Sequence, residues 1–313
     1  MRSLLCIAIG LAITGCTQDI RVNELPDVNY PPVEDDGSDS LVDDGTEPPE
    51  EPVETEDPVD EPEEEPVEEP VEDPPPVDDC EGTTDLIYVI DRAEEAIYTF
   101  DPTNGTFGFV GDLNCGSWEG SPASMAVGRD GIAYVRYSSN SLFAVDLETM
   151  SCSPTSYGSG FGNFGMGYAT QNSETWRDDL YIANSNTLAR VDMSTYAIRN
   201  VGSLPSQSEL TGNADGELWA FLPLEMPARL VRLDKNDASV VESFSLPNFS
   251  LADLDTFAFA NWGGEFYLFV RYYGMGSTTD VYKVNAAGQM SLFARDTGMD
   301  VVGAGVSTCA PTQ

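Results

Sequence analysis

Histidine is absent from this sequence of 313 residues, and basic residues of any kind are few. Without histidine the chain has no Ser-His-Asp or Cys-His catalytic group and no histidine-ligated metal site. Only 14 lysines and arginines accompany 54 aspartates and glutamates. Nucleic-acid-binding proteins neutralise phosphates with basic patches, so we expect no nucleic-acid partner. Because no CxxC spacing is present either, we expect neither a metal nor a cofactor.

Long apolar runs are also missing, except in the N-terminal stretch MRSLLCIAIGLAITGC. Arg2 gives it a positive start, and residues 4–13 form an apolar run that is short for a membrane span and typical of a signal peptide. Its ending, ITGC, resembles the bacterial lipobox, in which the cysteine is lipidated after cleavage. The resemblance implies a signal peptide over 1–15 and lipidation of Cys16, with an ordinary cleaved signal peptide as the alternative. By resemblance to the sorting rules of Gram-negative lipoproteins, threonine rather than aspartate at position 17 favours the outer membrane over retention in the inner membrane.

The segment that follows has almost no positive charge. Residues 17–79 hold 26 Asp or Glu, 13 Pro and one Arg in 63 positions. Such a chain repels itself and has little to bury, so residues 16–79 are predicted to form a disordered, extended linker. Polyproline II spacing of about 3.1 Å per residue gives it a reach of roughly 200 Å. An acidic tail that binds cations diffusely, or binds a partner, is the alternative to a spacer.

Residues 80–313 show apolar alternation, many glycines and a unit that recurs five times, which indicates an all-β domain. The repeat is sharpest in the third strand of each unit: IYTFDPTNGT from Ile97, LFAVDLETMS from Leu142, LARVDMSTYA from Leu188, LVRLDKNDAS from Leu230 and VYKVNAAGQM from Val281. Successive copies begin 42 to 51 residues apart. Each ends in Asp or Asn before a short turn, and turn chemistry explains these residues without calcium.

The repeat predicts a five-bladed β-propeller. One unit alone cannot bury both faces of its sheet, whereas blades stacked around an axis do so and leave only short edges. The first unit lacks an inner strand before Leu86, while VVGAGVSTC from Val301 resembles an inner strand without a blade. We therefore expect the C-terminal strand to complete blade one and close the ring.

Four cysteines remain in the domain, and an even number in an exported chain suggests two disulfides. If the C-terminal strand completes blade one, Cys309 ends beside Cys80, and a bond between them locks the ring. Elimination then pairs Cys115 with Cys152. The expected blade layout argues against this second pair. Cys115 follows the outer strand of blade one and Cys152 begins the outer strand of blade two, a layout that would place them at opposite ends.

Loops between blades and between second and third strands share one face of a propeller, where we place the candidate ligand-binding residues. Arginines end three of the second strands and would form a positive ring for an anionic ligand such as a carboxylate. Separate salt bridges are the alternative. Aromatic side chains in the loops would offer a platform for a sugar or peptide, unless they fill the space between blades. The candidates are Arg92, Arg136 and Arg271, with Trp118, Tyr157, Tyr272 and Tyr273 and also Phe161, Phe164 and Phe249.

The same face also collects carboxylates that would serve a glycosidase if two of them converged. A retaining pair needs carboxyl groups about 5–5.5 Å apart, and an inverting pair about 6.5–9.5 Å. Acidic loop residues are otherwise simply solvated. No residue is assigned as catalytic, and the acidic candidates are Asp91, Glu94, Glu95, Glu119, Glu225, Asp253 and Asp255.

The blade repeat resembles bacterial β-propellers with YVTN-, NHL- or quinoprotein-like blades. Together with the lipobox and the acidic Pro/Glu-rich linker, it looks like a set of bacterial surface lipoproteins that have no known activity. The resemblance implies a monomeric, lipid-anchored binding module for a glycan or protein, on the outer membrane at the cell surface or the periplasmic side. A carboxylate-based glycosidase or calcium-dependent lactonase, and a structural envelope protein, are the alternatives, because fold does not decide function.

Overall fold

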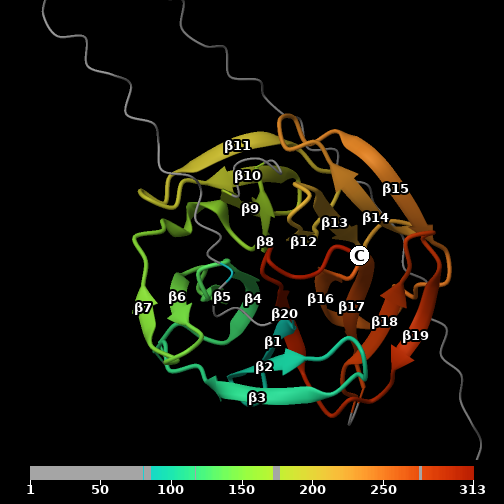
Figure 1. The fold of residues 1–313 in the computed structure, drawn as a ribbon, viewed down its shortest axis with the longest axis horizontal. Helices are drawn as coiled ribbons and strands as arrows, with labels where there is room; N and C mark the ends of the chain where they lie inside the picture. Colours follow the sequence, from blue (N-terminus) through green and yellow to red (C-terminus); the bar gives the residue numbers. More distant parts are fainter. Residues whose placement is uncertain (1–79, 81–85, 117, 172–176, 275–276) are drawn as a thin grey trace, which may run out of the picture. The chain divides into compact units, whose positions relative to one another are not determined.

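Five four-stranded antiparallel sheets stand around a common axis (Figure 1). The computed structural model describes residues 80, 86–116, 118–171, 177–274 and 277–313. The predicted signal peptide, the lipidated cysteine and the acidic linker lie outside these residues. The prediction of an all-β, five-bladed propeller is confirmed. In the described part of the chain the only helix is the three-residue 3₁₀ turn η1 (Ser159–Phe161), and no helix is long and apolar enough to cross a membrane.

The inner strands surround the axis, and a second strand pairs with each of them. From blade one to blade five, the inner strands are β20 (Val301–Gly305), β4 (Pro122–Val127), β8 (Gly165–Thr170), β12 (Glu209–Gly212) and β16 (Leu254–Trp262). In the same order, the second strands are β1 (Ile87–Asp91), β5 (Ile132–Tyr137), β9 (Asp178–Ala183), β13 (Leu218–Leu222) and β17 (Glu265–Tyr272).

The third and outer strands lie farther from the axis, and burial decreases in that direction. The third strands are β2 (Ala96–Phe100), β6 (Leu142–Asp146), β10 (Thr187–Val191), β14 (Ala228–Leu233) and β18 (Asp280–Val284). The outer strands are β3 (Phe107–Asp112), β7 (Cys152–Pro154), β11 (Ile198–Ser203), β15 (Val240–Leu246) and β19 (Met290–Ala294). Strand β1 is buried along its whole length, whereas most of β15 is exposed. The inner and second strands therefore form the buried part of the ring, where neighbouring blades pack together.

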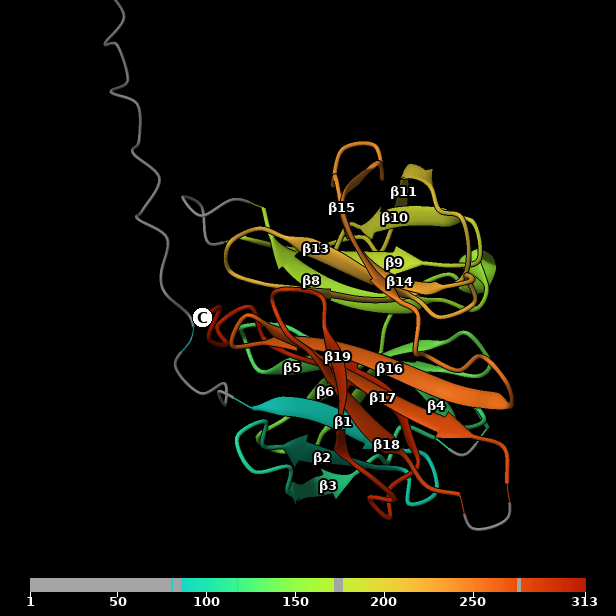
Figure 2. The same ribbon diagram turned by 90° about the vertical axis from the view of Figure 1, so that its right-hand side faces the viewer.

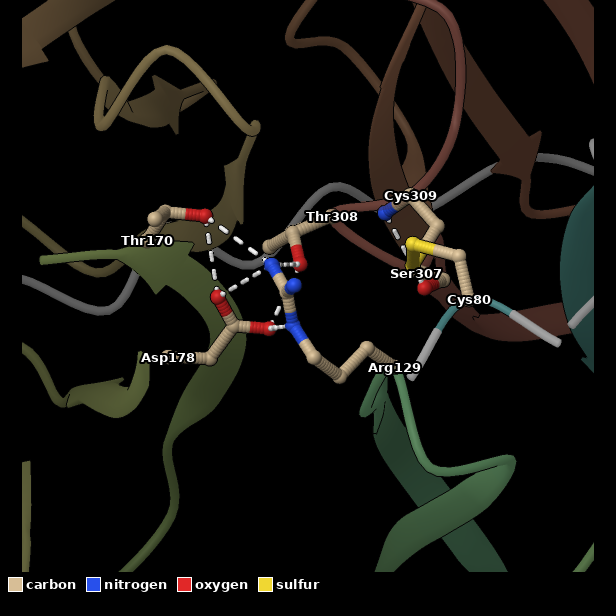
Figure 3. Close-up of a disulfide and its surroundings, with 7 residues drawn as sticks. All are labelled: Cys80, Arg129, Thr170, Asp178, Ser307, Thr308 and Cys309. Carbon is tan, nitrogen blue, oxygen red and sulfur yellow. Dashed lines mark hydrogen bonds and ion pairs between the residues drawn. A yellow bond between two sulfur atoms is a disulfide. The ribbon is translucent and has the colours of Figure 1, made fainter. Parts of the chain in front are cut away.

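The C-terminal strand closes the ring, as the sequence predicts. Strand β20 pairs antiparallel with β1, with Tyr88 opposite Gly305 and Ile90 opposite Gly303. The disulfide between Cys80 and Cys309 is present, with 5.6 Å between the Cα atoms (Figure 3). Because β20 is the last strand and β1 the first, this bond joins the two ends of the ring.

A buried polar cluster beside this disulfide ties three blades together (Figure 3). The Arg129 guanidinium binds both carboxylate oxygens of Asp178 at 3.1 Å. It also donates to the Thr308 hydroxyl at 2.9 Å, and the Thr170 hydroxyl donates to Asp178 at 2.9 Å. These residues come from blade two, blade three and the C-terminal segment, so the cluster holds the closing segment against the ring.

The second disulfide, between Cys115 and Cys152, is also confirmed, with 5.2 Å between the Cα atoms. The expectation that the two cysteines lie at opposite ends is wrong. Cys152 is opposite Val145 in the pairing of β7 with β6, and both cysteines pack against one core cluster shared by blades one and two. The loop after β3 therefore brings Cys115 back to the blade interface.

The turn after each third strand is built by the repeated Asp or Asn. The Asp101 carboxylate accepts a hydrogen bond from the Thr103 amide at 2.8 Å, and the Asp234 carboxylate accepts one from the Asn236 amide, also at 2.8 Å. Asn285 does the same for Ala287 at 3.0 Å. These side chains therefore shape the turns, in agreement with the interpretation from sequence.

The inner strands of blades three and four approach each other so closely that only glycine fits. A Cβ atom on Gly212 would lie 2.3 Å from the Tyr168 carbonyl oxygen, and one on Gly167 would lie 2.8 Å from the Leu210 carbonyl. We expect Gly212→Ala to lower the free energy of unfolding by about 2–3 kcal/mol in urea denaturation, since backbone must move. Gly160→Ala is the control, because nothing lies within 4 Å of its Cβ position. Equal effects would contradict the tight contact.

Candidate functional site

A polar pocket opens at the end of the axis where the second strands finish and the inner strands begin, which we call the top face. This axial pocket has a volume of about 380 Å³. All five blades line it, since Arg92 and Val302 belong to blade one, Arg136 to blade two, Asn163 to blade three, Glu209 to blade four and Asp255 to blade five. Its wall also includes Ser121, Pro122, Ala123, Ser138, Gln207, Thr256 and Phe257.

Two of the three predicted arginines form a closed ionic cluster at one side of the top face. Arg271 binds Asp255 at 3.0 Å and Asp300 at 2.9 Å. Arg92 binds the same two carboxylates, Asp300 at 3.0 Å and Asp255 at 3.5 Å. These contacts link blades one and five. The two positive and two negative charges cancel, so the cluster adds no net charge to the pocket. The salt-bridge alternative holds here, with partners that differ from the nearby Asp91 and Glu95.

Arg136 is placed differently from the other two arginines. It is 4% exposed, and its Nε and Nη1 donate to the backbone carbonyls of Phe164 at 2.9 Å and Tyr137 at 3.2 Å. Its guanidinium carbon also lies 5.4 Å from the centre of the Phe164 ring. Within the described residues no carboxylate lies within 4.0 Å of it. Burial lowers the pKa of the guanidinium, because desolvation disfavours its charge.

Glu209 is a fully buried carboxyl group at the start of β12, and the sequence analysis did not single it out. Its Oε2 accepts a hydrogen bond from the Ser124 hydroxyl at 3.0 Å, across the axis from blade two. Burial raises the pKa of Glu209 from its ordinary value near 4.5 to about 8, although the charge of Arg136 and the hydrogen bonds from Ser124 and the Met166 amide act in the opposite direction. The raised pKa favours the protonated form of Glu209, in a pocket that also holds the Arg136 guanidinium.

The predicted aromatic platform is distributed between the interior and the surface. Trp118 and Tyr273 are 91% and 70% exposed, in loops of the top face. Tyr157 is buried against Phe164, with 5.6 Å between the ring centres, and Tyr272 is half-buried in the core cluster of blades four and five. The structure thus separates exposed rings from rings that fill the space between blades.

Asp255 is the only one of the acidic candidates that lines the axial pocket, and most of the others have local hydrogen-bond or ion-pair partners. Asp91 accepts hydrogen bonds from the amides of Glu94 and Asp300, at 2.9 and 2.8 Å, and so shapes the backbone. Glu119 accepts from the hydroxyls of Ser139 and Ser141, which lower its pKa. Partners of the remaining acids include Tyr98 for Glu94 and Arg229 for Glu225, while Asp253 is exposed. No group of three or more potential metal ligands is found among the described residues.

A larger groove of about 660 Å³ lies between blades three and four, but its charges are already compensated. Arg190 binds Asp179 at 2.9 Å, and Arg232 lies 3.3 Å from Glu242. Lys235 donates to two backbone carbonyls at the end of β8. Exposed ion pairs of this kind are ordinary features of a surface, so the axial pocket is the stronger candidate.

No protein-family model matches this chain, and no curated protein matches it. Solved structures resemble its fold. A chain of a nidogen/laminin complex is 15% identical with a TM-score of 0.45, over 74% of this chain and 82% of that one. A protein of unknown function from Bacteroides caccae is 10% identical with a TM-score of 0.41, over 70% and 97%. Another from Bacteroides thetaiotaomicron is 13% identical with a TM-score of 0.42, over 67% and 55%. At such identities the likeness concerns the fold alone, and we base no inference about function on it.

Proposed function

We propose that this chain is a lipid-anchored binding module that presents the top face of its propeller to a glycan or protein. The observation that carries the proposal is the axial pocket, which all five blades line with polar groups and which contains two buried ionisable side chains. Buried charges and acids are costly unless something pairs with them, and they are typical of functional sites.

The position of Cys80 supports a binding role for the top face. Cys80 is bonded to Cys309, which follows the far end of β20, so the chain enters the propeller at the face opposite the axial pocket. Lipidation at Cys16 and attachment to the outer membrane are part of this proposal.

Substitution of Trp118 tests whether the top face binds the ligand. We expect Trp118→Ala to weaken binding to the glycan or envelope protein at least tenfold, since exposed aromatic residues at binding surfaces carry much of the affinity. The ligand is first found with the full-length chain on a glycan array and in pull-downs from envelope fractions, with and without calcium. Phe109→Ala is the matched control, because Phe109 is also exposed, at 60%, but lies on the outer strand β3. Equal losses in the two variants would reject the top face.

A carboxylate-based hydrolase is the second candidate, favoured by the presence of Glu209 and Asp255 in one pocket. A protonated glutamate is suited to general-acid catalysis, and a second carboxylate to the role of base or nucleophile. Release of nitrophenol from aryl glycosides by the full-length chain, abolished in both Glu209→Gln and Asp255→Asn, would establish this activity. Binding of a glycan without its hydrolysis would reject the hydrolase and leave the chain as a binding module.

A further inference from the structure

Arg136 lines the axial pocket, and no carboxylate of the described residues lies within 4.0 Å of its guanidinium. Arg92 and Arg271 on the same face each bind carboxylates within 3.5 Å, whereas Arg136 donates its hydrogen bonds to two neutral backbone carbonyls. A buried guanidinium without a counter-ion is costly, and a ligand that carries the missing negative charge recovers that free energy.

The rest of the pocket indicates which anion would fit. Asn163, Gln207, Ser121 and Ser138 line the wall with amides and hydroxyls, which are suited to bind ring hydroxyl groups. The volume of about 380 Å³ is near the lower limit for ligand pockets and suits one sugar ring better than an extended chain. Resting on the proposed function, we infer that the axial pocket binds the carboxylate of an acidic sugar, with Arg136 as its counter-ion.

Glu209 takes part in the same recognition. As a protonated acid it can donate a hydrogen bond to the sugar carboxylate, and once ionised it would repel that carboxylate and neutralise Arg136. The other ionisable groups that face the pocket are Arg92 and Asp255, which are paired with each other and with Asp300 and Arg271. The pH dependence of binding in the alkaline range should therefore come from Glu209.

Calorimetry on the full-length chain tests the inference with D-glucuronate, D-glucose and acetate as probes. We expect glucuronate to bind at least tenfold more tightly than glucose and than acetate, because only glucuronate offers both the charge and the ring hydroxyls. Arg136→Met should remove the advantage of glucuronate over glucose. Arg136→Lys, which keeps the charge, should retain part of it. Arg232→Gln, a change in an arginine of the outer groove, is the control.

The pH series gives a readout that loss of folding cannot imitate. Glucuronate affinity should fall several-fold between pH 7 and pH 9 in the wild type and stay level in Glu209→Gln. Equal binding of glucuronate and glucose, equal binding of glucuronate and acetate, or an unchanged preference in Arg136→Met would overturn the inference. If no monosaccharide binds but Trp118 still controls binding of a glycan or protein, this inference fails and the proposed function stands. If both fail, the top face is not a binding surface.

Discussion

Reducing the bond between the chain ends should destabilise this propeller more than any other single change considered. Replacing both Cys80 and Cys309 with serine is expected to lower the free energy of unfolding by about 5 kcal/mol, the full loop-closure entropy for a separation of 229 residues. The Cys115–Cys152 pair closes a loop of 37 residues, for which the same relation gives about 4 kcal/mol. Both losses arise mainly in the unfolded chain, which gains freedom when the bond is removed.

Urea denaturation of the two double-serine variants measures both losses under the same conditions. The variant that lacks the ring-closing bond between Cys80 and Cys309 should unfold at the lower urea concentration. In addition, its absence removes the covalent support of β20, which is held in blade one by pairing with β1 and by the cluster of Arg129 with Asp178 and Thr308. A lower midpoint for the Cys115–Cys152 variant would mean that the outer strand of blade two, and not the ring closure, limits stability.

The second large effect is a loss of folding stability with rising pH that comes from Glu209. Its folded-state pKa is raised to about 8, against an ordinary value near 4.5 in the unfolded chain. The stabilisation that the protonated acid provides is complete below pH 4.5 and is lost progressively as the pH rises through about 8, because the unfolded chain releases this proton first. The total for this shift is on the order of 5 kcal/mol.

Glu209→Gln should therefore become more stable relative to the wild type as the pH rises from 5 to 9. A glutamine oxygen can still accept the hydrogen bond that the Ser124 hydroxyl donates to Glu209, so the exchange mainly removes the ionisation. Thermal unfolding at each pH measures the difference between the two chains. Glu119→Gln is the control on the same face, since hydroxyl donors lower the pKa of Glu119 and it gives no such rise. A difference that does not change with pH would show that Glu209 is ionised in the folded chain.

The blades and their order follow from short-range patterns in the sequence. Apolar alternation, a turn with Asp or Asn after each third strand, and an unmatched strand at the C-terminus predict five blades and the closure of β20 onto β1. Each of these features depends on residues within one unit of the repeat, or on the requirement that the first and last strands of a closed ring lie side by side. The bond between Cys80 and Cys309 follows from the same requirement.

Only the tertiary structure decides which distant side chains share one environment. The sequence predicts three equivalent arginines, but the ring brings Asp300 and Asp255 to Arg92 and Arg271, whereas Arg136 has no carboxylate within 4.0 Å among the described residues. Nothing in the local pattern around Glu209 marks it, because its burial depends on Ser124, which is 85 residues away in another blade. Local pattern thus determines strands and turns, whereas the packing of five sheets around one axis determines the burial and the charge of the site.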